Sequence, residues 1–272
     1  MIKVNNVTKT FDGFRALDGL TMTVEQGSIY GLVGPNGAGK STILRHIMGV
    51  YRPDSGSILV DGQPVFENPA VKAKIAVIPD DLYYFPSAST RDMARFYRGM
   101  YPAFDGKRYE ALREAFPDVD DKQPIRRLSK GMQKQSAFWL ALCCQPQVLV
   151  LDEPTAGLDP VGVESILGNI RDYHQAHNAT VILVSHSMEE VARTVDRLVV
   201  VNDGKIPFQG TPRQVFQHGD ELEAMGLGVP QLTRVFHRLR AMGADVDPSV
   251  YTLEQAKAAL LNRLGRAGKG AV

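Results

Sequence analysis

The nine residues from Gly34 to Thr42, GPNGAGKST, constrain this chain more than any other stretch. They fit the spacing G-x-x-x-x-G-K-[ST] of a phosphate-binding loop. The apolar run 29–33 predicts a buried strand before the loop, and residues 42–48 predict the first turns of a helix after it. In this order, backbone N–H groups and the positive end of the helix converge on an anion. A glycine turn with a chance lysine is the alternative, but the context favours a nucleoside triphosphate site.

The residue types in the loop suit phosphate and metal binding. Glycines accept positive φ and let the backbone approach an anion closely. The Lys40 ammonium can reach the β- and γ-phosphates, and the Ser41 hydroxyl can bind Mg²⁺. The predicted nucleotide-binding set is the whole loop: Gly34, Pro35, Asn36, Gly37, Ala38, Gly39, Lys40, Ser41 and Thr42.

The composition excludes several classes of protein. The 31 basic and 30 acidic residues leave no surplus of positive charge for nucleic acid. The only cysteines, Cys143 and Cys144, are adjacent and lie in an apolar run, which predicts buried thiols in a reducing compartment. No apolar run approaches the ~20 residues of a membrane-spanning helix. We therefore expect a cytoplasmic protein that reaches a membrane only through a partner.

Two carboxylates follow a strongly apolar segment. The run 148–151 predicts a central strand, and Asp152 and Glu153 come directly after it. Asp152 is placed to hold Mg²⁺, directly or through water, and Glu153 could orient or deprotonate a water that faces the γ-phosphate. An acidic cap before Pro154 is the alternative. The phosphate loop upstream favours the catalytic interpretation.

Two more covered strands end in polar residues. The strand predicted at 75–78 is followed by Asp80, and the strand predicted at 181–184 is followed by His186. Open α/β sheets bind ligands at the carboxyl ends of their strands. Asp80 could therefore contact Mg²⁺ or water, and His186 could contact the γ-phosphate. An Asp-rich turn and a structural histidine are the alternatives.

The remaining segments predict the organisation of the chain. Residues 1–30 alternate apolar and polar side chains, which indicates antiparallel strands, and Phe11 between them is either core or a platform for a flat base. Residues 86–145 predict a helical insert, with Thr90 as the cap of its first helix. Residues 211–272 predict an appendage of small amphipathic helices, which begins with a capping box at Thr211 and frays from residue 265.

The ordered motifs resemble those of the ATPase subunits of ABC transporters over nearly the whole of residues 1–210. The phosphate loop is similar to their Walker A motif, and residues 148–153 are similar to their Walker B motif. Residues 128–133, LSKGMQ, resemble the signature motif, although Lys130 stands at a glycine position and Met132 precedes Gln133. The local sequence alone predicts that Ser129 is a helix cap. The resemblance implies instead that Ser129 and Gly131 contact phosphate.

The resemblance assigns further roles to matching residues. Asp159 matches the aspartate of the D-loop, His186 the switch histidine, and Phe11 the aromatic residue that stacks on adenine. Asp80 stands where most members have glutamine. The implied fold is an α/β P-loop NTPase with an antiparallel β subdomain, a mostly parallel core sheet, a helical insert and a helical C-terminal appendage. The ATPase domain is expected at 1–210 and the appendage at 211–272.

The resemblance also implies ATP and Mg²⁺ as cofactors, with Ser41, Asp80 and Asp152 as the metal ligands. It implies a second ATPase subunit, identical or different, and a transmembrane permease that holds the pair at the cytosolic face of the membrane. In that arrangement Ser129 and Gly131 of one subunit close over the ATP of the other. Glu153 and His186 are then the catalytic residues, and hydrolysis reopens the dimer.

Two transporter subfamilies are compatible with these features. Residues 78–86, the helical insert and the signature segment resemble subunits that serve drug, antibiotic or peptide exporters, and this interpretation is preferred here. Segments 210–216 and 226–230 and the region from Thr252 onward resemble energy-coupling-factor importers for vitamins or metal ions, in which the tail supports dimerisation. A non-transport ABC-type ATPase that acts as a switch on another protein or on nucleic acid is a third possibility. The transported substrate stays undetermined.

Overall fold

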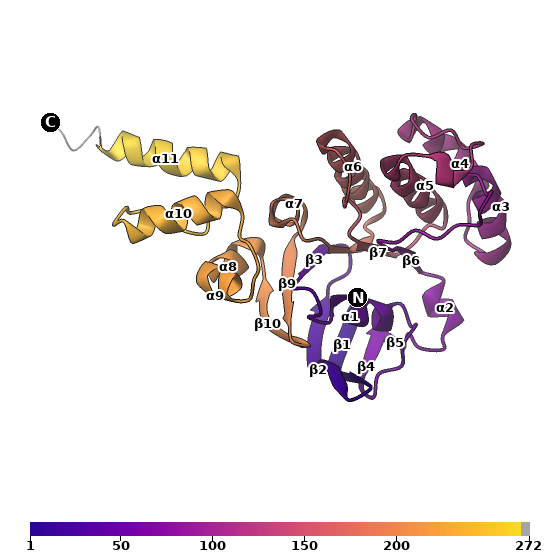
Figure 1. The fold of residues 1–272 in the computed structure, drawn as a ribbon, viewed down its shortest axis with the longest axis horizontal. Helices are drawn as coiled ribbons and strands as arrows, with labels where there is room; N and C mark the ends of the chain where they lie inside the picture. The colour runs from indigo at the N-terminus through magenta and orange to yellow at the C-terminus, as the bar shows by residue number, and fades with distance from the viewer. Residues whose placement is uncertain (268–272) are drawn as a thin grey trace.

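The computed structural model describes residues 1–267, with side chains described to residue 261, and contains two β-sheets (Figure 1). The antiparallel sheet has the order β2-β1-β4-β5 and consists of β1 (Ile2–Phe11), β2 (Phe14–Val24), β4 (Ser55–Val60) and β5 (Gln63–Pro64). The core sheet has the order β10-β9-β3-β8-β7-β6 and consists of β3 (Ile29–Val33), β6 (Ile75–Ile78), β7 (Val148–Asp152), β8 (Thr180–Val184), β9 (Arg197–Asn202) and β10 (Lys205–Gly210). Only β10 runs antiparallel to its neighbour among these core strands. The predicted α/β class is confirmed.

The helices lie on both faces of the core sheet (Figure 1). They are α1 (Lys40–Ile47), α2 (Pro69–Lys72), α3 (Thr90–Met100), α4 (Gly106–Ala111), α5 (Lys130–Cys143), α6 (Pro160–His177), α7 (Met188–Thr194), α8 (Pro212–Phe216), α9 (Gly219–Ala224), α10 (Gln231–Ala241) and α11 (Leu253–Ala267), with short 3-10 helices η1 (Leu112–Ala115) and η2 (Ile125–Arg127). None of these helices combines the length and apolar character needed to cross a bilayer, in the part of the chain that is described.

The core strands are continuously apolar because each of their faces borders a hydrophobic cluster. In β7, Leu149 and Leu151 belong to the cluster shared with α5, α6 and α7. Val148 and Val150 belong to the cluster shared with α1 and the antiparallel sheet. Successive side chains of a strand point to opposite faces, so a strand covered on both sides needs an unbroken apolar run.

The first helix of the insert begins one residue earlier than the sequence predicts. Ser89, not Thr90, is the N-cap of α3, and its hydroxyl accepts a hydrogen bond from the Asp92 backbone N–H at 3.2 Å. The Asp92 carboxylate accepts in return from the Ser89 N–H at 3.1 Å, which completes a capping box. The Thr90 hydroxyl instead bonds Ser136 of α5 at 3.1 Å, so it joins two helices of the insert.

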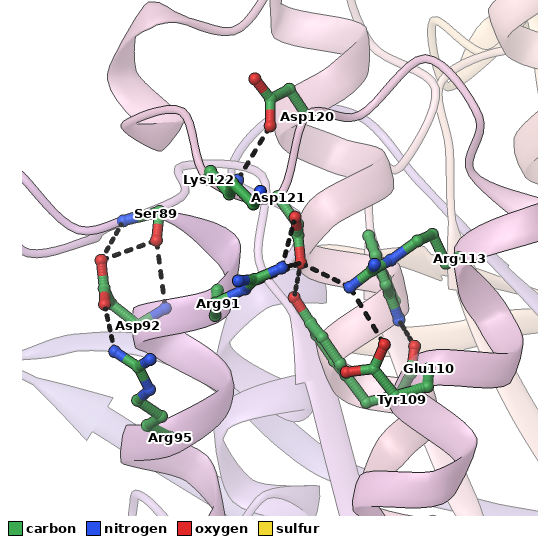
Figure 2. Close-up of polar contacts among 11 residues, drawn as sticks. Ser89, Arg91, Asp92, Arg95, Tyr109, Glu110, Arg113, Asp120, Asp121 and Lys122 are labelled. Atoms are coloured by element: carbon green, nitrogen blue, oxygen red, sulfur yellow. Dashed lines mark hydrogen bonds and ion pairs between the residues drawn. The ribbon is translucent and has the colours of Figure 1, made fainter.

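A buried carboxylate holds the insert together. Figure 2 shows Asp121 between Arg91 of α3, Tyr109 of α4 and Arg113 of η1. Its oxygens accept hydrogen bonds from Arg91 at 3.2 Å, from the Tyr109 hydroxyl at 3.0 Å and from Arg113 at 2.9 Å. Asp121 is 7% exposed. One carboxylate thus connects three segments of the insert.

Asp121→Ala is expected to destabilise the protein. The substitution leaves the buried Tyr109 hydroxyl without its acceptor, which costs about 1–3 kcal/mol. Urea unfolding followed by circular dichroism measures the loss as a lower transition midpoint. Glu110→Ala is the matched control, because Glu110 pairs with Arg113 at 3.1 Å but its side chain is 65% exposed. Equal midpoints for the two variants would contradict a structural role for the buried carboxylate.

The C-terminal appendage consists of two parts. Helices α8 and α9 contribute Val215, Phe216 and Leu222 to the main core. Helices α10 and α11 lie side by side beyond them (Figure 1, far left) and share a small core around Phe236 and Val250. The predicted capping box opens α8, with Thr211 as N-cap. The segment 265–272, predicted to fray, lies partly within α11, and its last five residues lie outside the described residues.

Candidate functional site

The topology brings the predicted site residues to one edge of the core sheet. Strands β3, β8, β7 and β6 are parallel neighbours, so the segments that follow their carboxyl ends lie next to one another. A cavity of about 530 Å³ opens at this edge. The predicted site residues that line it are Phe11, Asn36, Gly37, Gly39, Lys40, Ser41, Thr42, Asp80, Asp152, Glu153 and His186.

The phosphate loop is shaped by two close backbone approaches. A side chain at Gly34 would lie 2.2 Å from the Val201 carbonyl oxygen in β9, so only glycine fits there. Gly39 has φ of 109°, and a side chain there would lie 2.7 Å from the Ala16 carbonyl oxygen in β2. The loop is therefore held between the core sheet and the antiparallel sheet, and its glycines serve tight packing as well as backbone freedom.

Lys40 is buried at the start of α1 and folds back over the loop. Its ammonium donates hydrogen bonds to the carbonyl oxygens of Gly34 at 2.6 Å and Pro35 at 3.0 Å. Burial lowers the pKa of Lys40, and the negative charges of Glu153 and Asp152 oppose that shift. The loop carbonyls thus hold a cation at the centre of the loop, where it can exchange these bonds for phosphate oxygens.

The carboxylates at the ends of β6 and β7 form an acidic wall of the cavity. Burial raises the pKa of Asp152, and the neighbouring charge of Asp80 raises it further. A divalent cation would relieve both effects. The carboxylates and the Ser41 hydroxyl line the same cavity and supply oxygen donors, which are the ligands that suit Mg²⁺. The residues therefore fit the predicted ion, with phosphate and water completing its coordination.

Glu153 lies beside His186 in a constrained conformation. Its φ is 48°, a left-handed value that costs a non-glycine residue about 1–3 kcal/mol. Oε2 accepts a hydrogen bond from the His186 backbone N–H at 3.3 Å, and Oε1 lies 3.2 Å from the His186 Nε2. The geometry of the second contact makes no hydrogen bond, so Oε1 is a buried acceptor without a donor among the described residues. Burial raises the pKa of Glu153, and His186 partly offsets the shift.

An aromatic group closes the other end of the cavity. Phe11 and Tyr51 meet edge to face with ring centroids 5.4 Å apart, and the Arg45 guanidinium lies over the Tyr51 ring. Phe14, 65% exposed, also lines the cavity. Of these four residues, the sequence analysis identified only Phe11. The Phe11-Asp-Gly-Phe14 hairpin is a local signal that could have added Phe14, whereas Arg45 and Tyr51 carry no local signal.

Six predicted site residues do not line this cavity. Gly34, Pro35 and Ala38 contribute backbone to the loop, with the Ala38 carbonyl accepting from the Gly204 N–H at 2.9 Å. Ser129 caps α5, where its hydroxyl accepts from the Met132 N–H at 3.2 Å, and Gly131 follows in the first turn. Asp159 caps α6 by accepting from the Gly162 N–H at 2.7 Å. Ser129 is exposed, so it is available to a second molecule.

Comparison with known proteins places the chain among ABC transporters. The family model described as ABC transporter matches residues 17–156. The energy-coupling factor transporter ATP-binding protein EcfA2 of Clostridium tetani is 35% identical over 284 residues, covering 96% of each chain. The energy-coupling factor transporter ATP-binding protein EcfA of Methanoculleus marisnigri is 32% identical over 282 residues, covering 98% of this chain and 99% of that protein.

One solved structure agrees with these relatives. CbiO1 of Clostridium perfringens, described as part of the ABC transporter complex cbiONQ, superposes with a TM-score of 0.70 at 29% identity. The match covers 88% of this chain and 98% of that chain. These comparisons favour the importer alternative over the preferred exporter interpretation, and they identify transport subunits rather than a soluble switch. The chain belongs to the ABC transporter family as an ATP-binding subunit that couples ATP hydrolysis to transport.

Proposed function

We propose that this chain is one ATPase subunit of an energy-coupling-factor importer. The observation that carries the proposal is the length of the match to relatives of that name. Because only 4% of the chain lies outside the alignment with the Clostridium tetani protein, the alignment includes most of residues 211–272. That appendage carried the importer resemblance in the sequence. The exporter interpretation rested instead on residues 78–86, the helical insert and the signature segment.

The proposed reaction uses the cavity residues in order along the nucleotide. The adenine stacks on Phe11, and the phosphates bind the loop backbone, the Lys40 ammonium and the hydroxyls of Ser41 and Thr42. Mg²⁺, held by Ser41, Asp152 and Asp80, would neutralise charge on the phosphates. Water binds the unpartnered Oε1 of Glu153, which removes its proton as the water attacks the γ-phosphate. His186 steadies the γ-phosphate.

The proposal includes a second ATPase subunit. Ser129 and Gly131 lie at the N-terminus of α5 and do not line the cavity of their own chain. They can contribute N–H groups and a hydroxyl to an anion only if it is brought by another molecule. We place them over the ATP of a subunit docked head to tail, with Asp159 at the contact between the two. ATP binding closes this dimer, and hydrolysis opens it.

We place the permease contact on the insert, at the cytosolic face of the membrane. Several large apolar side chains on the insert and on the segment just before it are exposed, with Tyr83 at 93%, Phe85 at 56% and Phe96 at 42%. A cavity of about 180 Å³ lies beside them, lined by Tyr84, Tyr97 and Tyr101 among others. An exposed apolar patch next to a pocket is typical of a protein interface. The Asp121 network lets the insert transmit dimer closure to the permease as one body.

The experiment that tests the proposal is affinity purification of the tagged full-length chain from gently solubilised native membranes. We expect a transmembrane scaffold subunit together with a small substrate-binding membrane protein. As a matched control, Phe96→Glu should lose these partners, because it places a charge in the apolar patch, while the isolated subunit keeps its ATPase activity. Recovery of a permease pair without a substrate-binding protein would contradict the importer proposal and support the exporter interpretation. Absence of any membrane partner would contradict both.

A further inference from the structure

A buried lysine lies where the helical insert meets the catalytic edge of the sheet. Lys134 is on α5, directly after the signature segment 128–133, and is 8% exposed. A buried ammonium is costly unless it is paired and hydrogen-bonded. The partners of Lys134 therefore define its role. No role was assigned to it from the sequence.

Both partners of Lys134 belong to the cavity. Its Nζ donates a hydrogen bond to the main-chain carbonyl oxygen of Glu153 at 2.5 Å, and lies 3.6 Å from Oδ1 of Asp80. The Glu153 carbonyl also accepts from the Ala156 N–H at 3.2 Å. One ammonium thus connects α5, the segment after β6 and the segment after β7.

The bond to Glu153 falls at a strained residue. Glu153 has a left-handed φ of 48°, and its N–H is fixed by the Val184 carbonyl at 3.0 Å. With its N–H bonded to β8 and its carbonyl bonded to α5, the peptide units on both sides of its Cα are held. These two anchors set the direction in which the Cα–Cβ bond leaves the backbone. Strain persists only where the surroundings over-determine the conformation.

We infer that Lys134 is a positioning residue that fixes the backbone of Glu153 and so aims the Glu153 carboxylate at the attacking water. The inference rests on the proposed catalytic role of Glu153. Lys134 does not itself line the cavity. Lys134 lies on α5, whose N-terminal end holds Ser129 and Gly131. When these residues bind the ATP of a partner subunit, the Lys134 side chain transmits the contact from α5 to the backbone of Glu153.

A purely structural role makes different predictions. A lysine that only stabilises the fold would, when replaced, lower the melting temperature and the active fraction without a specific effect on turnover per folded molecule. A lysine that contributes to ATP binding would raise KM or the dissociation constant of ATP. A positioning role instead lowers kcat while KM stays close to the wild-type value.

The test compares Lys134→Met and Lys134→Gln in the full-length chain, with Lys107→Met as the matched control. Lys107 is an exposed lysine of α4 in the same insert. Lys134→Met keeps an unbranched side chain but has no donor, whereas Lys134→Gln keeps a neutral N–H donor. Since small misplacements of reacting groups cost up to about 100-fold, we expect Lys134→Met to lower kcat about 10- to 100-fold with KM within about twofold. Lys134→Gln should retain more of kcat, and Lys107→Met should match the wild type.

Folding of each variant is checked by thermal unfolding, and the Gln variant serves if the Met variant does not fold. Wild-type kcat in a folded Lys134→Met protein would overturn the inference, as would a rise in KM without a fall in kcat. Glu153→Gln, measured in parallel, distinguishes a failure of the positioning role of Lys134 from a failure of the catalytic role of Glu153. If Glu153→Gln stops turnover and Lys134→Met does not, only the role of Lys134 fails. If Glu153→Gln itself turns over normally, the proposed catalytic role fails as well.

Discussion

Glu153→Gln is expected to lower ATP turnover by about 10²–10⁴-fold, the range in which a positioned general base contributes. The amide keeps the size of the side chain and one acceptor oxygen, but it cannot take a proton from the attacking water. Lys40 and the loop backbone, which hold the phosphates, are unchanged, so ATP should still bind. The variant should therefore accumulate with ATP bound, as the closed dimer of the proposed cycle.

Two measurements follow this variant. Phosphate release under saturating ATP gives kcat, and size-exclusion chromatography with ATP and Mg²⁺ reports the trapped dimer. Glu114→Gln is the matched control, because Glu114 is an exposed glutamate of η1 that does not line the cavity. Wild-type turnover in Glu153→Gln would remove Glu153 from the role of base. A stalled variant that stays monomeric with ATP would contradict the closed dimer as the trapped state.

The same substitution should raise the stability of the nucleotide-free protein at neutral pH. Burial raises the pKa of Glu153, so the folded state favours the protonated carboxyl. For an acid with a raised pKa, the favourable contribution exists below the ordinary value of 4.5 and is lost as the pH rises through the folded-state value. At neutral pH the ionised group is a cost that glutamine removes. Differential scanning calorimetry without nucleotide checks the sign, and a lower Tm would contradict it.

Much of the catalytic edge could be predicted because its signals are local in the sequence. The phosphate loop, the pair Asp152-Glu153 and His186 each directly follow an apolar run that can only be a covered strand. Parallel strands then bring their carboxyl ends together without further information. The strand order itself, with β8 between β3 and β7, was not predicted, since apolar runs do not specify their neighbours.

The contacts that join distant segments could not be predicted in this way. Tyr51 meets Phe11 across 40 positions of sequence, and Lys134 reaches the Glu153 carbonyl from a different helix. Their residue types fit many surfaces, so only the folded chain gives them a function.

The prediction of Thr90 as the N-cap of α3 was wrong for a local reason. Ser89 and Thr90 are both good caps, and the reciprocal bond with Asp92 selects Ser89.

The prediction of the transporter type depended on which segment of the sequence was given more weight. The exporter preference rested on residues 78–86, the insert and the signature segment, and the first two of these lie at the proposed permease contact. However, a bacterial Atm1-family ABC exporter with ATP bound gives a TM-score of 0.72 at 26% identity over 82% of this chain and 41% of that chain. The CbiO1 structure gives 0.70. Because both backbones superpose with similar scores, the overall fold does not separate the two types, and in the proposed function the appendage distinguishes them.

Lys40→Ala is expected to weaken ATP binding about 10- to 150-fold, which corresponds to the 1.5–3 kcal/mol of a hydrogen bond to a charged group. The ammonium is the only cation that lines the cavity at the phosphate loop among the described residues, since Arg45 lies at the aromatic end. It is already desolvated and held by the carbonyls of Gly34 and Pro35. Binding therefore requires little new ordering of the side chain, and its removal forfeits most of the interaction.

Isothermal titration with ATP and Mg²⁺ measures this loss. Lys3→Ala, on an exposed position of β1, is the matched control and should bind as the wild type does. Lys40→Arg tests whether charge alone suffices. The guanidinium is larger and planar, and the space between the loop carbonyls is fitted to one ammonium, so we expect it to restore only part of the affinity. Unchanged affinity in Lys40→Ala would contradict the phosphate-binding assignment of the loop and, with it, the proposed position of the nucleotide. If Lys40→Ala lowers kcat but leaves ATP affinity unchanged, Lys40 stabilises the transition state and does not contribute to ATP binding.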